Sequence, residues 1–179
     1  EHAMAALMAH KIDNCRIELD APEMPILDGS AFYIVNAIQK AGIIAQNKPR
    51  NYFEVKEEIH FEHQGSSLSI VPADYFSAEV HIDFNSPILP AQSATLEHLD
   101  LFDQEIAEAR TFVFVREIAP LLQHNLIKGG DLDNAIVIYD QPLNKESITD
   151  ICNKLGVPVI EVEDLGYLNH RPLEWGNEP

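Results

Sequence analysis

The stretch SAFYIVNAIQKAGIIAQNKPRNYFEV (residues 30–55) changes its apolar spacing along its length, and this change decides the fold class. In its first half, apolar residues recur at the spacing of one helix face: Ala31, Ile34, Val35, Ile38 and Ala41. Ser30 can cap this helix and Gly42 can end it. After a polar linker at residues 45–51, the spacing becomes two, which is typical of strands. The two patterns together predict a mixed α+β protein built from packed layers.

The residues before this stretch predict one helix, one strand and a turn. Residues 1–10 are mainly Ala, Leu and Met, which favour a helix. Residues 12–20 alternate apolar and polar side chains, which predicts a half-buried strand. Two prolines then make a rigid connection that ends in a turn at Asp28-Gly29.

The residues after it alternate between strand and helix patterns, with the cleanest strand at residues 76–84. Strands are expected at residues 53–61, 68–70, 76–84, 134–140 and 157–163, and helices at 101–109, 115–124 and 148–155. A glycine and two serines at residues 65–67 predict a turn before the second strand.

The composition excludes several classes of partner. Twelve basic and 29 acidic residues give a net charge of −17, and such a surface repels nucleic acid. No apolar run approaches the roughly 20 residues that cross a bilayer, so no transmembrane segment is expected. Cys15 and Cys152 fit neither a disulfide framework nor a CxxC metal site. Reduced thiols and a cytoplasmic location are therefore predicted.

Three stretches could carry chemistry, and each has a plainer interpretation. Glu1-His2 could be a base beside a zinc ligand, or a solvated acid beside a helix-capping histidine. Thr111, in an apolar run, could donate to an oxyanion, or it could cap the helix expected at 115–124. Gly129-Gly130 could approach a phosphate or simply form a turn. From these residues alone, the plainer interpretation is favoured in each case.

Taken in order, four separated motifs resemble one family. They are EHAMAAL with IDN (from Glu1), PEMPILDGSA (residues 22–31), EIAEARTFVFVREI with LIKGGDLDNAIV (residues 105–137), and the terminal NEP. The chain is similar to the zinc-dependent UDP-3-O-acyl-N-acetylglucosamine deacetylases of lipid A biosynthesis. The resemblance implies two similar layered α+β domains, each represented in part. The first would end at residue 47 and the second would span 48–179, with an insertion at about 140–169.

The resemblance also implies an activity, which is hydrolysis of the N-acetyl group of a UDP-sugar that carries a 3-O-hydroxyacyl chain. One Zn²⁺ would be held by two histidines and an aspartate, and the ligands other than His2 are expected beyond Pro179. This piece alone would then be inactive. Some long relatives are fused to a 3-hydroxyacyl-carrier-protein dehydratase, so a similar fusion is possible here. The alternative is a non-catalytic acidic binding module that keeps the fold without a complete metal site.

Individual roles carry over by position. His2 matches a zinc ligand, Glu1 the general base, and Thr111 the hydroxyl that stabilises the oxyanion. Phe112 matches an aromatic residue near the sugar, and Leu27 an apolar residue at the mouth of the site. The passage for the acyl chain would be lined by Val115, Ile118, Ile127, Gly130, Ala135 and Val137. The family usually has Gly-Gly-Ser where this chain has Gly129-Gly130-Asp131, which places an acid beside the passage.

Overall fold

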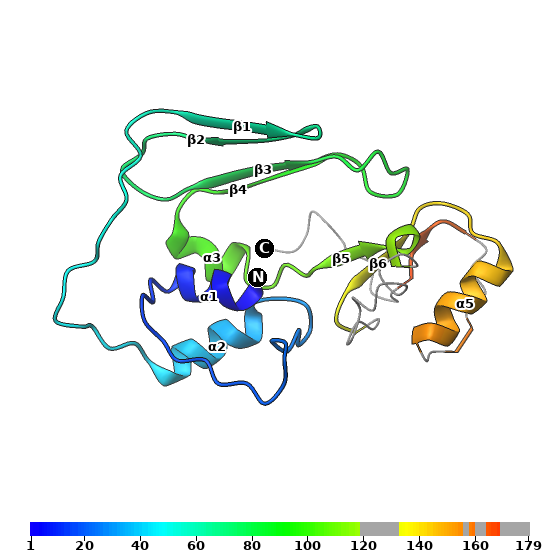
Figure 1. The fold of residues 1–179 in the computed structure, drawn as a ribbon, viewed down its shortest axis with the longest axis horizontal. Helices are drawn as coiled ribbons and strands as arrows, with labels where there is room; N and C mark the ends of the chain where they lie inside the picture. Colours follow the sequence, from blue (N-terminus) through cyan, green and yellow to red (C-terminus); the bar gives the residue numbers. More distant parts are fainter. Residues whose placement is uncertain (119–132, 156–157, 160–163, 169–179) are drawn as a thin grey trace.

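The computed structural model describes residues 1–118, 133–155, 158–159 and 164–168, and it confirms the α+β class (Figure 1). Its helices are α1 (His2–Ala9), α2 (Phe32–Ala41), the 3₁₀ helix η1 (Leu99–Leu101), α3 (Phe102–Glu105) and α5 (Lys145–Leu155). Its strands are β1 (Ile59–His63), β2 (Ser66–Ile70), β3 (Ala78–Ile82), β4 (Gln92–Leu96), β5 (Phe112–Phe114), β6 (Ile136–Tyr139) and β7 (Gly166–Tyr167). Residues 115–118 are also helical. No helix among the described residues is long and apolar enough to cross a membrane.

The first core joins α1 and α2 to the segment that follows β4. Its buried members are Ala6, Ala9, Ala31, Val35, Leu96, Phe102 and Ala107. Alanines dominate it because small side chains let helices approach closely, and Ala6 is completely buried. The helix that the spacing of residues 31–41 predicts is confirmed, and Gly42 ends it with a positive φ of 76°.

Two antiparallel hairpins form a separate layer beside these helices (Figure 1). In the first, β1 pairs with β2 through a tight turn in which Gln64 and Gly65 both have positive φ, as a type I′ turn requires. In the second, β3 pairs with β4, and Val80 lies opposite Ala94. Every residue of β1 and β2 is exposed in this structure. Leu96 at the end of β4 connects the second hairpin to the first core.

A three-stranded sheet, β5-β6-β7, builds the second half of the described fold, with β5 parallel to β6 and β7 antiparallel to it. All four residues of β6 are buried, as expected of a continuous apolar run covered on both faces. On one face, Val137 and Tyr139 pack with Ile151 of α5. On the other face, Ile136 and Ile138 pack with Phe114 and Leu89.

Several sequence predictions differ from the structure. Residues 12–20, expected as a strand, form neither helix nor strand, and Ile17 and Leu19 remain 49% and 47% exposed. Alternation alone is not sufficient there, because a strand also needs a neighbour for its backbone groups. The segment at 53–58 is likewise irregular. The strand β4 was not predicted, since its sequence QSATL is short and mostly polar.

The helix expected at 101–109 is also shorter than predicted. It ends at Glu105: the amide of Ile106 closes the last turn on the carbonyl of Phe102, and the amide of Ala107 donates to this same carbonyl, five residues back, so the regular α-helical ladder does not continue. Of the helix expected at 115–124, the first four residues are confirmed and the rest lie outside the described residues. Most of the strand expected at 157–163 also lies outside them.

The helical segment at 115–118 is tied to the end of β6 by a buried ion pair. Arg116 Nη1 donates to Asp140 Oδ2 at 2.6 Å, and the Asp140 side chain is fully buried. The second oxygen of Asp140 has no hydrogen-bond partner among the residues that the structure describes. The guanidinium also lies 4.3 Å from the centre of the Phe114 ring, a cation–π contact. Among the residues that the structure describes, Arg116 is thus the one partner of this carboxylate.

We expect Arg116→Met in the full-length protein to lower the free energy of unfolding by about 3 kcal/mol, because a buried charge would lose its partner. The double variant Arg116→Met/Asp140→Leu should recover most of this loss, because no buried charge remains. Lys154→Met, which removes a surface pair with Asp150, is the matched control and should cost less than about 0.5 kcal/mol. Urea-induced unfolding measures all three. A double variant as unstable as the single one would contradict this account.

Candidate functional site

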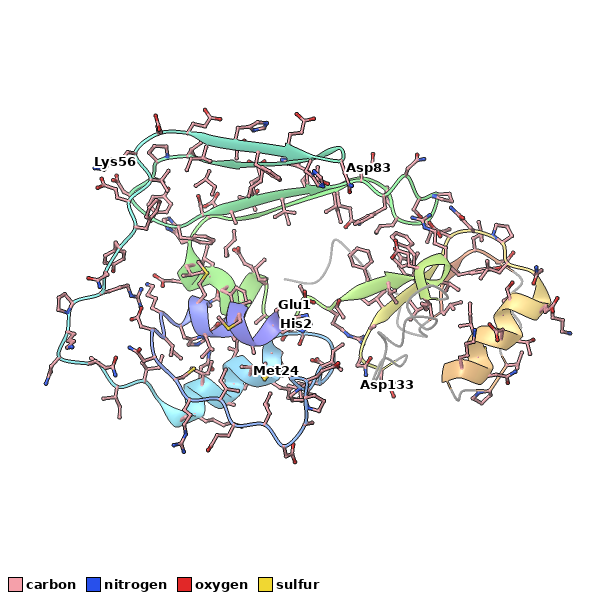
Figure 2. The ribbon with its side chains drawn as sticks, in the orientation of Figure 1. Glu1, His2, Met24, Lys56, Asp83 and Asp133 are labelled. Carbon is pink, nitrogen blue, oxygen red and sulfur yellow. The ribbon has the colours of Figure 1, made fainter. Side chains whose placement is uncertain are left out.

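Glu1 and His2, the residues predicted to take part in metal chemistry, lie at the start of α1. Ala3, Ala6 and Ala9 form its buried face, and His2 opens it (Figure 2). The His2 side chain is 22% exposed and that of Glu1 is 78% exposed. His2 Nε2 lies 3.5 Å from Glu1 Oε1. The Glu1 carbonyl accepts the amide of Ala5 at 2.9 Å, so its backbone belongs to the first helical turn while its carboxylate remains in solvent.

A compact turn at residues 26–30 precedes α2. The amide of Gly29 donates a hydrogen bond to the carbonyl of Ile26 at 3.0 Å, and both Leu27 and Gly29 have positive φ. Asp28 Oδ1 accepts the amide of Ser30 at 3.1 Å and its hydroxyl at 2.8 Å. The Ser30 oxygen in turn accepts the amide of Phe32 at 3.1 Å. The N-cap residue of α2 is Ala31 and not Ser30 as predicted, but the buried Ser30 still satisfies the amide of Phe32, the first residue of the helix.

Thr111 lies between this turn and the segment that leads into β6. Its amide donates to Gly29 O at 2.7 Å, and its carbonyl accepts the amide of Ile136 at 2.9 Å. A Cβ on Gly29 would lie only 2.2 Å from the Asn134 carbonyl oxygen and 3.3 Å from the Thr111 methyl carbon. The interpretation of Thr111 as a helix cap is wrong, because the residue leads into the strand β5.

Arg110, immediately before Thr111, links the same segments through its side chain. Its Nε donates to Asp28 O at 2.8 Å and its Nη2 donates to Asp133 O at 2.6 Å. Sequence reasoning assigned no role to Arg110, because its partners are main-chain carbonyls that no local pattern reveals. The available signal was an arginine at the edge of an apolar run.

The residues predicted to line the acyl passage are only partly brought together. Val115, Ile118 and Val137 share one buried cluster with Tyr139 and Ile151. Each of the three is about 5–6% exposed, so here they form a closed core. Ala135 is buried outside this cluster, and Ile127 and Gly130 lie outside the described residues.

The two remaining predicted contacts are more accessible. Phe112 is 36% exposed and packs edge-to-face on Phe84, with ring centres 5.4 Å apart. Leu27, on the turn before α2, is 43% exposed. Both side chains therefore present apolar surface that a ligand could cover.

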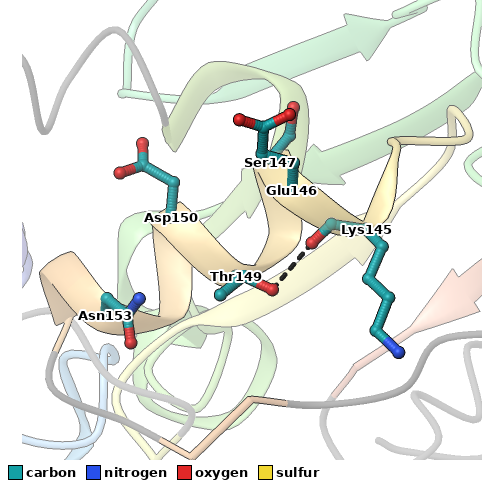
Figure 3. A pocket seen from close by; sticks show the side chains of 6 residues that line it. All are labelled: Lys145, Glu146, Ser147, Thr149, Asp150 and Asn153. Carbon is teal, nitrogen blue, oxygen red and sulfur yellow. Dashed lines mark hydrogen bonds between the residues drawn. The ribbon is translucent and has the colours of Figure 1, made fainter.

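Two depressions among the described residues lie elsewhere. One, of about 580 Å³, is lined by six residues that all belong to α5 (Figure 3). Another, of about 250 Å³, lies between the end of α1 and η1, where Lys11 donates to Asp100 at 2.7 Å. That hydrogen bond and the positive charge of Lys11 lower the pKa of Asp100. Neither depression includes Glu1, His2 or Thr111, so volume does not identify the site.

The residues present fit part of a zinc site. No cluster of three or more His, Cys, Asp or Glu side chains occurs in the part of the chain that the structure describes. His2 nevertheless offers an imidazole on a rigid helix, and the adjacent carboxylate of Glu1 is accessible to water. An imidazole and a nearby proton acceptor are the donor types that zinc hydrolases use. The described residues thus offer one imidazole and one carboxylate of the types that such a site would use.

The chain is an α+β protein that carries a carboxylate–imidazole pair at the start of a helix. A family model described as UDP-3-O-acyl N-acetylglycosamine deacetylase matches residues 1–150, and the chain belongs to this family.

Curated relatives extend the same similarity. A "Bifunctional enzyme LpxC/FabZ" of Porphyromonas gingivalis is 51% identical over the whole chain, and one of Bacteroides thetaiotaomicron is 49% identical over 99% of it. A "UDP-3-O-acyl-N-acetylglucosamine deacetylase" of Vibrio parahaemolyticus is 42% identical over 83% of the chain. The chain spans 39% of the length of each bifunctional relative and half of the Vibrio protein.

Proposed function

We propose that the full-length protein hydrolyses the N-acetyl group of UDP-3-O-(3-hydroxyacyl)-N-acetylglucosamine in lipid A biosynthesis, with Zn²⁺ as cofactor. The observation that carries this proposal is the Glu1–His2 pair, 3.5 Å apart at the start of α1, in a chain of the deacetylase family. His2 would be one ligand of the ion, and the other ligands would lie outside the described residues. When bound, Zn²⁺ supplies Lewis-acid activation of water and carbonyl.

The residues of this chain would divide the remaining work between a base and a hydrogen-bond donor. Glu1 would accept a proton from the water whose oxygen attacks the amide carbon, and its exposed carboxylate supports this role. The Thr111 hydroxyl would donate to the oxyanion that forms at the same carbon. The C–N bond then breaks, the amine takes a proton, and acetate leaves.

The apolar residues would select the acyl chain. Val115, Ile118 and Val137, which pack together, would form its passage with Ile127, Gly130 and Ala135. Each buried CH₂ contributes about 0.8 kcal/mol, so such a passage can discriminate chain length. In this structure Val115, Ile118 and Val137 form a closed core with Ile151. Entry of an acyl chain between them would therefore require Ile151 and α5 to shift. Phe112 and Leu27 would contact the sugar and the mouth of the site.

The wider organisation is also a proposal. The domain boundary would lie at residues 47/48, and α5 would belong to an insertion at about 140–169. The bifunctional names of the Porphyromonas and Bacteroides relatives support a fusion to a 3-hydroxyacyl-carrier-protein dehydratase. We further propose a cytoplasmic location, where the UDP-sugar would be available.

Metal removal tests the proposed function. Dialysis of the full-length protein against a chelator should abolish release of acetate from the UDP-sugar, and one equivalent of Zn²⁺ should restore it, because activation of water depends on the ion. Metal analysis before and after dialysis gives the stoichiometry. A chelated protein that keeps its full rate would refute the metal mechanism. A metal-free native protein that binds the UDP-sugar without hydrolysing it would favour the non-catalytic acidic module.

A further inference from the structure

The Arg110 side chain bridges two backbone segments that are far apart in the sequence. Its two donors contact the carbonyls of Asp28 and Asp133, residues that precede Gly29 and Asn134. The backbones of Gly29 and Asn134 themselves lie so close that a Cβ on Gly29 would overlap the Asn134 carbonyl. The guanidinium thus holds together the two segments between which the Thr111 backbone is bound.

The same contacts determine how the Thr111 side chain is oriented. The Thr111 methyl carbon lies 3.3 Å from the position that a Cβ on Gly29 would occupy, so the methyl group faces the glycine. A threonine has a stiff χ1 angle, and packing of its methyl group therefore fixes its hydroxyl. Any displacement of the turn at residues 26–30 would change this packing. Arg110 holds that turn through Asp28 O.

The chemistry of the bridge requires arginine. A guanidinium is planar and presents donors in two directions, so Nε and Nη2 can bind different carbonyls at once. The ammonium of lysine is a single point of charge on a flexible chain, and it cannot reproduce this fixed bridge. Lysine keeps the positive charge, however, which separates the effect of geometry from that of charge.

We propose that Arg110 is a positioning residue for the deacetylation, which keeps the Thr111 hydroxyl directed at the oxyanion by clamping the turn at residues 26–30 to the segment before β6. This inference rests on the proposed function, because it needs Thr111 as the donor. A donor that acts only on the transition state affects kcat and not KM.

A double-mutant cycle on the full-length protein tests the proposal. We expect Arg110→Lys to lower kcat about 10- to 100-fold, less than the roughly 100- to 1,000-fold that complete loss of one oxyanion donor causes, with KM changed less than about twofold. In the Thr111→Ala background, the same substitution should change kcat less than about twofold, because the residue through which it acts is gone. Arg16→Lys, at an exposed arginine that pairs with the nearby Glu18, is the control and should leave kcat unchanged.

The outcomes separate this inference from the proposed function. If Thr111→Ala lowers kcat but Arg110→Lys has no effect, or has the same effect in both backgrounds, the positioning role is overturned and the proposed function stands. If Thr111→Ala itself keeps the normal rate, the donor role fails and the positioning role fails with it.

A second measurement covers the case in which Arg110→Lys folds poorly. Methylguanidinium added to Arg110→Ala should raise kcat several-fold by occupying the vacated bridge, and it should not raise kcat of Arg110→Ala/Thr111→Ala. Equal rescue in both variants would overturn the proposal.

Discussion

The Glu1→Gln variant of the full-length protein should hydrolyse the UDP-sugar about 100- to 10,000-fold more slowly, the usual contribution of a general base. Glutamine has nearly the same shape as glutamate, but its amide cannot accept the proton of the attacking water. The Glu1 side chain is 78% exposed, so the substitution removes no buried contact. The Glu1 carbonyl keeps its bond to the Ala5 amide, so the start of α1 should also be unchanged.

Steady-state rates and zinc content, measured on the same preparation, check this result. The variant should retain the zinc of the unmodified protein, since the proposed ligand His2 is untouched. Glu18→Gln is a matched control, because this carboxylate is also exposed and pairs with the nearby Arg16. A Glu1→Gln protein that stays within threefold of the normal kcat would exclude Glu1 as the base. Loss of zinc in the variant would instead point to a role in metal retention.

Substitution of Gly29 by alanine should have the largest effect on stability, with a loss of about 4 kcal/mol or more. Two costs combine. The φ of +86° is strained for any residue with a Cβ, and that Cβ would overlap the Asn134 carbonyl oxygen at 2.2 Å. Because a backbone oxygen cannot rotate away, the turn and the segment before β6 would have to separate.

The chain provides a control that isolates the overlap. Gly42 also has a positive φ, of 76°, but an added Cβ there would meet nothing within 4 Å. With a φ of 76° and a ψ of 166°, Gly42 lies in a region open essentially to glycine alone, so Gly42→Ala should cost only this backbone strain, about 1–3 kcal/mol. Urea-induced unfolding of both variants gives the difference. Equal losses at the two positions would show that the contact between Gly29 and Asn134 adds nothing to stability.

The sequence predicted those parts of the fold whose patterns are local. The helix α2, the apolar strand β6 and the helix α5 were all expected from their spacing, and all are present. No strand was predicted for residues 112–114, which lie between two expected helices, yet they form β5, because a partner more than 20 residues away in the sequence completes the strand. Residues 12–20 have the alternation of a strand but no paired neighbour among the described elements.

The candidate site likewise contains residues that the sequence indicated and contacts that it did not indicate. Glu1, His2 and Thr111 were identified by resemblance, and their chemical roles remain predictions. Arg110 and the close approach of Gly29 to Asn134 could not be anticipated. Both are contacts to backbone carbonyls that lie 23 to 105 residues away in the sequence, and a backbone carbonyl is present at every residue, so no residue type indicates it.

The complete burial of Ala6 affects how His2 is held at the start of α1. Ala6 lies one helical turn after His2, so the imidazole stands over the most tightly enclosed position of the helix. An alanine has no rotamers to exchange, and its contacts therefore do not loosen through side-chain motion. The position of the His2 imidazole therefore depends on the packing of Ala6, which no side-chain rotation can loosen. A larger side chain at position 6 would displace this turn of α1 and the imidazole with it.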